Sequence, residues 1–259
     1  MGNLSGKNIV ISGANTGIGK TVALESAKEG ANVILAVRNG KKAEYLKNKI
    51  KKIGRKAIVI EFDVTKKETI KSLVDESKKK FGKIHVFFNN AGVSTMNKVV
   101  NLSEAEWDFN LNVNLKGVFL SCQYQALFLM KQGKGKIINN ASMAGKRGAP
   151  FLAHYAASKY GVIGFSKSLA LELAPYGITV NCICPGFVKT DMQKREIKWE
   201  AVLRNMPEKE VKKEYIDMTP LGRLVETKDV ANVFNFLASD YSDFMTGQAL
   251  NITGGIETN

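Results

Sequence analysis

A tyrosine and a lysine in the second half of the chain have the spacing of a proton-transfer pair. Tyr155 and Lys159 are four residues apart, so a helix beginning after Pro150 would place both side chains on one face. A nearby ammonium group favours the phenolate, so Lys159 is expected to lower the pKa of Tyr155 from its free value of roughly 10. Ser142 precedes the pair on another element, and its hydroxyl could hold a carbonyl or alcohol oxygen beside the phenol. A Tyr-x-x-x-Lys pair alone also fits a solvated helix face, so its meaning depends on the elements that position it.

A glycine-rich turn near the amino end favours binding of a dinucleotide. The apolar strand predicted over residues 7–12 runs into Gly13-Ala-Asn-Thr-Gly17-Ile-Gly19, and a helix is predicted from there to Gly30. In this context small residues let the backbone approach a pyrophosphate, and the helix N-terminus supplies amide donors. The spacing differs from the common Gly-x-Gly-x-x-Gly, so the match to the general dinucleotide-binding motif is imperfect.

The end of the second predicted strand, residues 31–37, favours NADP over NAD. Arg38 and Asn39 stand where an acidic residue would bond the ribose 2′-hydroxyl of NAD. No carboxylate is present there to repel a 2′-phosphate, and the guanidinium of Arg38 could bind one. The alternative is a solvated arginine at a strand end.

Strands and helices alternate along the whole chain. Further strands are predicted over 57–62, 84–88, 135–141, 178–184 and 248–252, and further helices over 41–53, 65–82, 103–132, 155–175 and 227–238. Without a repeat or a linker, this pattern predicts one doubly wound Rossmann-type domain over residues 1–259. Its fold class is α/β, with a mostly parallel seven-stranded sheet and helices on both faces.

Three local patterns refine this prediction. The sequences Thr65-x-x-Glu68 and Ser103-x-x-Glu106 predict capping boxes at two helix starts. Asparagine and glycine within residues 112–117 predict a distortion inside a long helix, unless Gly117 marks a tight helix crossing. The segment 189–223 is the least regular part of the chain and is expected to form a substrate lid with one or two amphipathic helices.

Composition and charge argue against several classes of protein. The chain is 44% hydrophobic and 24% charged, its apolar runs are shorter than a membrane span, and residues 1–7 do not resemble a secretory signal. We therefore expect a cytoplasmic protein without membrane contact. Three cysteines do not suggest a disulfide framework, and the two histidines lack metal-ligand spacing, so no metal site is predicted. The formal charge of +14 comes from small lysine clusters without interleaved aromatics, which does not favour nucleic-acid binding.

In their order along residues 5–255, these motifs resemble the short-chain dehydrogenase/reductase family. The resemblance matches Asn114, Ser142, Tyr155 and Lys159 to the catalytic tetrad of that family. It implies that Tyr155 is the acid in reduction and the base in oxidation, and that Ser142 positions the substrate oxygen. Lys159 is expected to lower the pKa of Tyr155 and to bond the nicotinamide ribose, and Asn114 to support a water that relays protons.

The resemblance also implies the binding residues. Asp63 matches the residue that bonds adenine, and Thr190 matches the one that holds the nicotinamide carboxamide. The full set of expected cofactor-binding residues is Gly13, Asn15, Thr16, Gly17, Ile18, Gly19, Arg38, Asn39, Asp63, Val64, Asn90, Ala91, Gly92, Tyr155, Lys159, Pro185, Gly186, Val188 and Thr190. Substrate contacts are expected from Ser94, Met96, Ser142, Met143, Tyr155 and Phe187.

The substrate is open between two classes. The first is a small secondary alcohol or ketone, such as a polyol, sugar, acetoin-like compound or hydroxysteroid, interconverted with NADP(H); the stretches 92–96, 106–110 and 244–248 resemble that group. The alternative is a 3-oxoacyl-[acyl-carrier-protein] reductase. Its acidic carrier would dock on basic residues, for which the candidates are Lys131, Lys134, Lys136, Lys146 and Arg147. The complete tetrad disfavours a non-catalytic protein, and the resemblance implies a homotetramer.

Overall fold

Seven strands rich in β-branched and aromatic residues pair into one sheet, in which every ladder is parallel. The computed structural model describes residues 2–259. The strands are β1 (Asn8–Ser12), β2 (Asn32–Val37), β3 (Ala57–Glu61), β4 (Val86–Asn89), β5 (Gly135–Asn140), β6 (Ile178–Pro185) and β7 (Ala249–Ile252). Their order is β3-β2-β1-β4-β5-β6-β7. The predicted doubly wound Rossmann-type sheet is confirmed, and each strand lies within about two residues of its predicted range.

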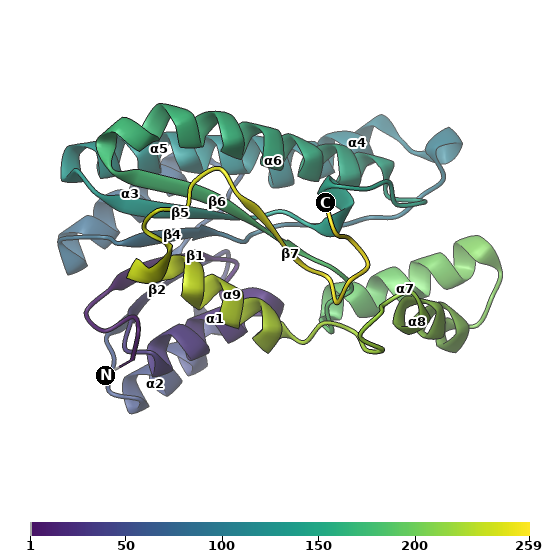
Figure 1. Ribbon diagram of the computed structural model, residues 1–259, viewed down its shortest axis with the longest axis horizontal. Helices are drawn as coiled ribbons and strands as arrows, with labels where there is room; N and C mark the ends of the chain where they lie inside the picture. Colours follow the sequence, from purple (N-terminus) through teal and green to yellow (C-terminus); the bar gives the residue numbers. More distant parts are fainter. Residues whose placement is uncertain (1) are drawn as a thin grey trace.

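Helices cover both faces of the sheet (Figure 1). One layer holds α1 (Gly17–Lys28), α2 (Glu44–Lys52) and α9 (Thr227–Ala238). The other holds α3 (Lys67–Phe81), α4 (Glu104–Leu111), α5 (Gly117–Gln132) and α6 (Ala153–Leu173). Two further helices, α7 (Asp191–Arg204) and α8 (Glu208–Asp217), stand apart from these layers, beyond the carboxyl ends of the strands. None of the helices within residues 2–259 is long and apolar enough to cross a membrane.

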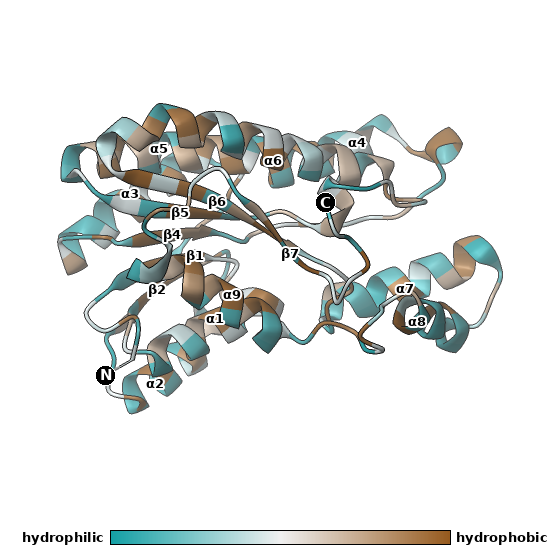
Figure 2. Ribbon diagram, viewed as in Figure 1, coloured by the Kyte–Doolittle hydropathy of each residue, from teal (hydrophilic) through white to brown (hydrophobic). Residues whose placement is uncertain are grey.

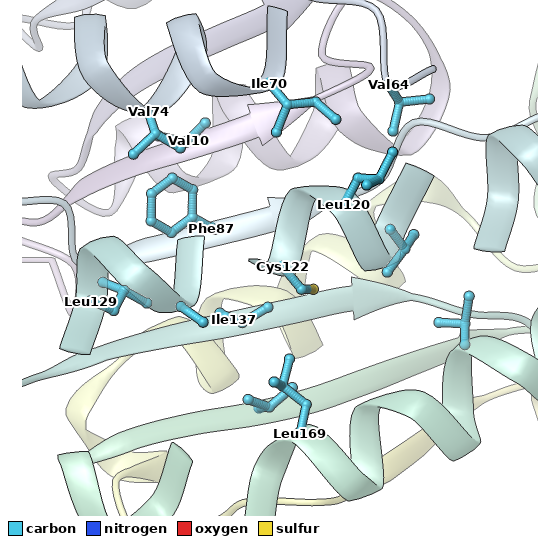
Figure 3. Packing of buried hydrophobic residues seen from close by; sticks show 14 of the residues in the cluster. Val10, Val64, Ile70, Val74, Phe87, Leu120, Cys122, Leu129, Ile137 and Leu169 are labelled. Carbon is cyan, nitrogen blue, oxygen red and sulfur yellow. The ribbon is translucent and has the colours of Figure 1, made fainter. Parts of the chain in front are cut away.

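Successive residues of the strands pack into two different apolar cores. Val10 in β1 and Phe87 in β4 join the core beneath α3, α5 and α6, and Figure 3 shows them together with Val74 and Leu129 of the same core. Their neighbours, such as Phe88, join the core beneath α1 and α9. Because side chains alternate across a strand, a sheet covered on both faces needs apolar residues at almost every position. The apolar strands and the polar outer helix faces in Figure 2 follow from this requirement.

The strand order reverses at β1, which lies between β2 and β4. In open α/β sheets of this kind, ligands bind in the crevice outside the carboxyl ends of the strands at the reversal. The turns after β1, β4, β5 and β6 all reach this edge of the sheet, and they carry the residues that the sequence analysis singled out.

One of the two predicted capping boxes is wrong. The helix α3 begins at Lys67, and its N-cap residue Lys66 makes no side-chain capping bond. Thr65 precedes the N-cap position, and its hydroxyl donates to Oδ1 of Asp63 at 2.7 Å, a local bond to a neighbouring carboxylate. The other box is confirmed: Ser103 Oγ accepts from the Glu106 amide, and the Glu106 carboxylate accepts from the Ser103 amide.

The distortion predicted within residues 112–117 is confirmed as a π-helical turn, Asn112–Lys116, between α4 and α5. The tight crossing considered as the alternative is present as well. A Cβ atom at Gly117 would lie 2.5 Å from Cγ2 of Val64 and 3.1 Å from its carbonyl oxygen. The irregular turn and the glycine together let the helix pass directly over the loop after β3.

The variant Gly117→Ala is therefore expected to be less stable than the wild type. Overpacking of this kind costs about 1–3 kcal/mol, which a urea unfolding curve measures as a lower midpoint. Gly164→Ala on α6 is the matched control, because no heavy atom lies within 4 Å of a Cβ added there. Alanine favours a helix over glycine, so the control should unfold at an equal or higher urea concentration. Equal midpoints for Gly117→Ala and the wild type would contradict the close packing.

Candidate active site

A cavity of about 1490 Å³ opens at the carboxyl edge of the sheet. Its walls come from the turns after β1, β2, β3, β4, β5 and β6, from the first turns of α6, and from α7 and α8. Ligand pockets for single small molecules have volumes of roughly 300–1,000 Å³. The cavity is thus large enough for a dinucleotide together with a second, smaller molecule.

Most of the residues expected at the site line this cavity. They are Gly13, Asn15, Thr16, Gly17, Ile18, Arg38, Asn39, Asp63, Val64, Asn90, Ala91, Gly92, Ser94, Ser142, Met143, Tyr155, Lys159, Pro185, Gly186, Phe187, Val188 and Thr190. Gly19, Met96 and Asn114 are buried behind its wall and do not line it. The chemistry-bearing residues therefore converge although they are spread over nearly 180 positions of the chain.

The glycine turn after β1 has the shape of an anion cradle. Gly13 and Gly17 adopt φ angles of +65° and +50°, which favour glycine, and a Cβ at Gly19 would lie 2.4 Å from the Gly13 carbonyl oxygen. The Asn90 side chain donates to this same carbonyl at 3.3 Å and so ties the turn to the end of β4. Thr16 makes no side-chain capping bond at the start of α1, which leaves first-turn amides for a ligand. These residues fit a pyrophosphate.

Two cationic side chains line the cavity near the loop after β2. Arg38 and Lys42 are both exposed and both line the wall. The sequence analysis did not single out Lys42, because the Lys41–Lys42 pair also fits a solvated helix face. Burial alone would raise the pKa of Asp63 nearby, but bonds from Thr65 and the charges of Lys66 and Arg38 hold it below its usual value.

Tyr155 lines the cavity, and its pKa is raised. Burial is the main cause, the carboxylate of Glu196 adds to it, and a hydrogen bond with Ser142 opposes both. Lys159 Nζ lies 5.5 Å from the centre of the phenol ring and donates to the carbonyl of Asn140 at 2.8 Å. The predicted net lowering of the Tyr155 pKa by Lys159 is therefore wrong for this arrangement. Burial also lowers the pKa of Lys159, to about 8.

Asn114 holds the loop after β4 from behind. Its Oδ1 accepts from the Val93 amide at 2.9 Å, and its Nδ2 donates to the Val93 carbonyl at 2.9 Å and to Ser158 Oγ at 3.2 Å. A Cβ at Gly92 would lie 3.2 Å from Asn114 Oδ1 and 3.8 Å from Lys159 Nζ. Asn114 is thus close to Lys159, and its amide group bonds to the Val93 backbone and to Ser158 in the protein interior.

The segment expected to form a lid folds around a small core of its own. Ile197, Ala201, Val211, Tyr215 and Leu224 are buried together, and the ring of Phe187 stacks on that of Tyr215 at 3.9 Å. Thr190, the N-cap residue of α7, accepts from the Gln193 amide at 3.3 Å. The side chains of Arg204 and Tyr215 both bind Glu200. The two helices therefore form one ordered wall of the cavity.

Glu196 on α7 is a cavity residue that the sequence analysis missed. It is half-buried, and its burial raises the pKa of its carboxyl group to about 7, against the opposing effects of Ser94 and Arg195. Helical spacing could have found it, since Met192, Glu196 and Trp199 recur every three or four residues and all line the cavity. Without the position of the cavity, however, nothing distinguishes this face of α7 from a solvated one.

The basic residues considered as a carrier-docking patch do not form one surface. Lys134 and Lys136 lie at the amino end of β5, at the opposite edge of the sheet from the cavity, and both pair with Asp243. Lys136 is only 5% exposed. Lys146 donates to the carbonyl of Ala249, and of the five candidates only Arg147 lines the cavity. That docking prediction is therefore wrong as stated, because the sheet separates two of the lysines from the site.

Comparison with known proteins agrees with this geometry. Residues 13–257 match the family described as enoyl-(acyl carrier protein) reductase. The 3-oxoacyl-[acyl-carrier-protein] reductase of Staphylococcus epidermidis is 38% identical over 251 residues, covering 96% of this chain and 98% of that protein. The corresponding reductase of Thermotoga maritima is 39% identical over 253 residues, 98% of each chain.

Solved structures of similar proteins superpose closely. NAD⁺-bound xylitol dehydrogenase has a TM-score of 0.94 at 33% identity, covering 97% of this chain and 99% of its own. Levodione reductase has a TM-score of 0.92 at 30% identity, with 97% and 98% covered. A short-chain type dehydrogenase/reductase from Mycobacterium marinum has a TM-score of 0.90 at 32% identity, with 99% and 97% covered. Because the family match and these relatives span almost the whole chain, the protein belongs to the short-chain dehydrogenase/reductase family of oxidoreductases.

Proposed function

We propose that this protein is an NADP(H)-dependent reductase that converts the 3-oxo group of an acyl thioester to a hydroxyl group. The observation that carries the proposal is the end-to-end similarity to proteins named 3-oxoacyl-[acyl-carrier-protein] reductase, at 38–39% identity. The convergence of Ser142, Tyr155 and Lys159 in one cavity supports the reaction class. This assignment favours the alternative substrate of the sequence analysis over its first choice.

The cavity residues suit the cofactor. The turn after β1 would hold the pyrophosphate, and the two cations Arg38 and Lys42 would bind a 2′-phosphate, which supports NADP over NAD. Thr190 and the loop after β6 would lie against the nicotinamide. When bound, the reduced nicotinamide supplies a hydride to the carbonyl carbon.

The protein's own residues would handle the proton. The Ser142 hydroxyl, which is close enough to Tyr155 to lower the pKa of the phenol, would hold the substrate oxygen beside it. Tyr155 would then give its proton to that oxygen as the carbon is reduced. The raised pKa keeps the phenol protonated at neutral pH, and this is the form that reduction needs. Lys159 would bond the nicotinamide ribose, and Asn114 would hold the loop after β4 in place.

Two exposed arginines of the cavity wall suit a negatively charged substrate arm. Arg147 and Arg195 are exposed and line the wall from opposite segments of the chain. Cationic side chains beside a binding cavity attract anionic phosphopantetheine groups and their carriers.

A homotetramer also stays part of the proposal, supported by exposed apolar side chains on α5 and α6, namely Phe119, Leu127 and Leu171. The cytoplasmic location stays a prediction.

A second candidate is the reduction of a small polar ketone. The observation that favours it is the carboxylate of Glu196 inside the cavity, which a purely hydrocarbon acyl chain would leave without a partner. The structural likeness to levodione reductase and xylitol dehydrogenase agrees with it.

A rate comparison with NADPH separates the two candidates. The thioester proposal predicts that acetoacetyl thioesters of N-acetylcysteamine and of acyl carrier protein are reduced with a higher kcat/KM than ketoses, diketones or oxo-steroids. The measurement is the loss of NADPH absorbance at matched substrate concentrations. Activity confined to the free ketones would reject the thioester assignment and leave the reaction class intact.

A further inference from the structure

Thr95, in the loop after β4, lines the cavity but has no part in the transfer of the proton and the hydride. We propose that its hydroxyl donates a hydrogen bond to the second carbonyl oxygen of the substrate, that of the thioester, and that Asn110 and His154 orient it for this contact. The inference rests on the reduction of a 3-oxoacyl thioester in the proposed function, because that substrate has a second carbonyl two carbons from the reacting one. The sequence analysis expected substrate contacts from the neighbours Ser94 and Met96, and not from Thr95.

Three side chains from separate elements meet at the Thr95 hydroxyl. Asn110 on α4 and His154 on α6 are fully buried, while Thr95 is half-buried. Asn110 Nδ2 lies 2.9 Å from Thr95 Oγ1, and His154 Nε2 lies 2.6 Å from it. Within residues 2–259, Thr95 Oγ1 makes no other hydrogen bond. The cluster therefore ties the loop after β4 to the first turn of α6, which carries Tyr155.

The helix backbone fixes which end of the Asn110 amide faces Thr95. The amide nitrogen also lies 3.0 Å from the carbonyl oxygen of Glu106, one helical turn earlier. A backbone carbonyl oxygen only accepts hydrogen bonds, so the amide must present its nitrogen at this place. Thr95 Oγ1 therefore accepts a hydrogen bond from Asn110, which uses one of its two lone pairs.

The surroundings of His154 fix which of its ring nitrogens carries the proton. Burial is the largest influence and lowers the pKa of His154, so at neutral pH the ring is uncharged and has a single N–H group. Nδ1 is buried and has no hydrogen-bond partner within residues 2–259. Buried N–H groups without a partner are rarer in proteins than acceptors without one. The proton is therefore on Nε2, which donates it to Thr95 Oγ1.

A hydroxyl that accepts two hydrogen bonds has only its own hydrogen left to give. Asn110 and His154 use both lone pairs of Thr95 Oγ1, and no protein group within residues 2–259 accepts its hydrogen. Because Thr95 lines the cavity, this hydrogen is available to a ligand. The ligand group at this place must be an acceptor, and the carbonyl oxygen of a thioester is one. An alkyl group in its place would leave the hydroxyl without a partner, which is unfavourable.

The tautomer of His154 can be measured directly in the protein labelled with ¹⁵N at its histidines. The chain has two histidines, and the other one, His85, accepts from the Asn8 amide through Nδ1, so it is an internal reference for a neutral ring protonated at Nε2. The signals missing from His154→Gln or from His85→Gln assign the spectrum. We expect ¹⁵N–¹H correlations of the Nε2–H form for His154 at neutral pH. A proton on Nδ1 would overturn the proposal, and this measurement needs no change at Thr95.

The substrate contact is tested with two ketones that differ only in the second carbonyl. They are acetoacetyl-N-acetylcysteamine and its thioether analogue, in which a methylene group replaces the thioester carbonyl. The preference of the wild type for the thioester is measured as a ratio of dissociation constants with NADP⁺ present, from the fluorescence of Trp199 in the cavity wall, and as a ratio of kcat/KM with NADPH. In Thr95→Val this preference should fall about 3- to 10-fold, the value of one neutral hydrogen bond. Thr95→Ser keeps the hydroxyl and should retain the preference.

Two variants of His154 test its role as a positioning residue. In His154→Leu the Thr95 hydroxyl loses one of the two groups that orient it, so the preference for the thioester should fall. In His154→Gln an amide N–H can take the place of Nε2–H, and the preference should be restored. A loss of stability alone would lower the activity on both ketones and would leave their ratio unchanged. An unchanged ratio in His154→Leu would therefore reject this role.

The outcomes separate the contact at Thr95 from the proposed function. No preference for the thioester in the wild type, or an equal preference in the wild type and Thr95→Val, overturns the contact. If the thioester binds with a preference that depends on Thr95 but is not reduced, the thioester assignment fails and the contact stands. If the thioester is reduced and Thr95→Val leaves the preference unchanged, the contact fails and the assignment stands.

Discussion

Tyr155→Phe is expected to lower the turnover number for carbonyl reduction by about 100- to 10,000-fold, the range that general acid catalysis supplies. Phenylalanine keeps the ring and its packing but cannot donate a proton to the substrate oxygen. Because the phenol is part of the cavity wall and not of the glycine turn, the dissociation constant for NADPH should change little. The measurements are single-turnover oxidation of NADPH and titration of its fluorescence.

Tyr160→Phe serves as the control for this result. Tyr160 lies one residue after Lys159 on α6, is exposed to solvent, and does not line the cavity. Its hydroxyl should be dispensable. The raised pKa of Tyr155 also predicts how the rates depend on pH. Because the phenol stays protonated around neutral pH, the rate of carbonyl reduction should not change with pH in that range. The rate of alcohol oxidation, which needs the phenolate, should increase as the pH rises. Near-normal turnover by Tyr155→Phe would end the assignment of this residue as the acid.

Arg38→Ala is expected to raise the dissociation constant of NADPH by about 10- to 100-fold and to leave that of NADH nearly unchanged. The reason is that a guanidinium–phosphate pair is a charge-assisted, bidentate hydrogen bond, whereas the 2′-hydroxyl of NADH offers this residue no charge. Isothermal titration with each nucleotide measures the effect. Lys42→Ala should have the same sign with a smaller size, because an ammonium acts as a single point charge.

Lys41→Ala is the matched control for the cofactor experiment. Lys41 is exposed beside Lys42 and carries the same charge, but it does not line the cavity. A general loss of positive charge would weaken NADPH binding equally in both lysine variants, and the effect would fade with added salt. Equal weakening of NADPH and NADH by Arg38→Ala would refute a specific contact with the 2′-phosphate.

Much of this molecule was predictable because its local patterns are strong. Apolar runs such as residues 84–88, short turns and helical periodicity determine a parallel sheet covered on both faces, and the turns after its strands must then meet at one edge. That single consequence is enough to bring Gly13, Ser142 and Tyr155 to the same place. The capping box at Ser103 and the distortion near Asn114 were predictable for the same reason, since both depend on residues a few positions apart.

Tertiary structure alone decided the electrostatics and the substrate end of the site. The pKa of Tyr155 depends on its burial and on Glu196, which is 41 positions away in sequence, so the four-residue spacing to Lys159 could not give its sign. The raised pKa of Glu196, and the position of Lys136 at the opposite edge of the sheet beside Asp243, likewise depend on how distant segments pack. Sequence spacing determines which residues share a helix face or a strand end. The tertiary structure determines what surrounds each residue, and with it the pKa of the residue and the substrate groups it can contact. At this site, these surroundings are complete only when the helices α7 and α8 close one side of the cavity.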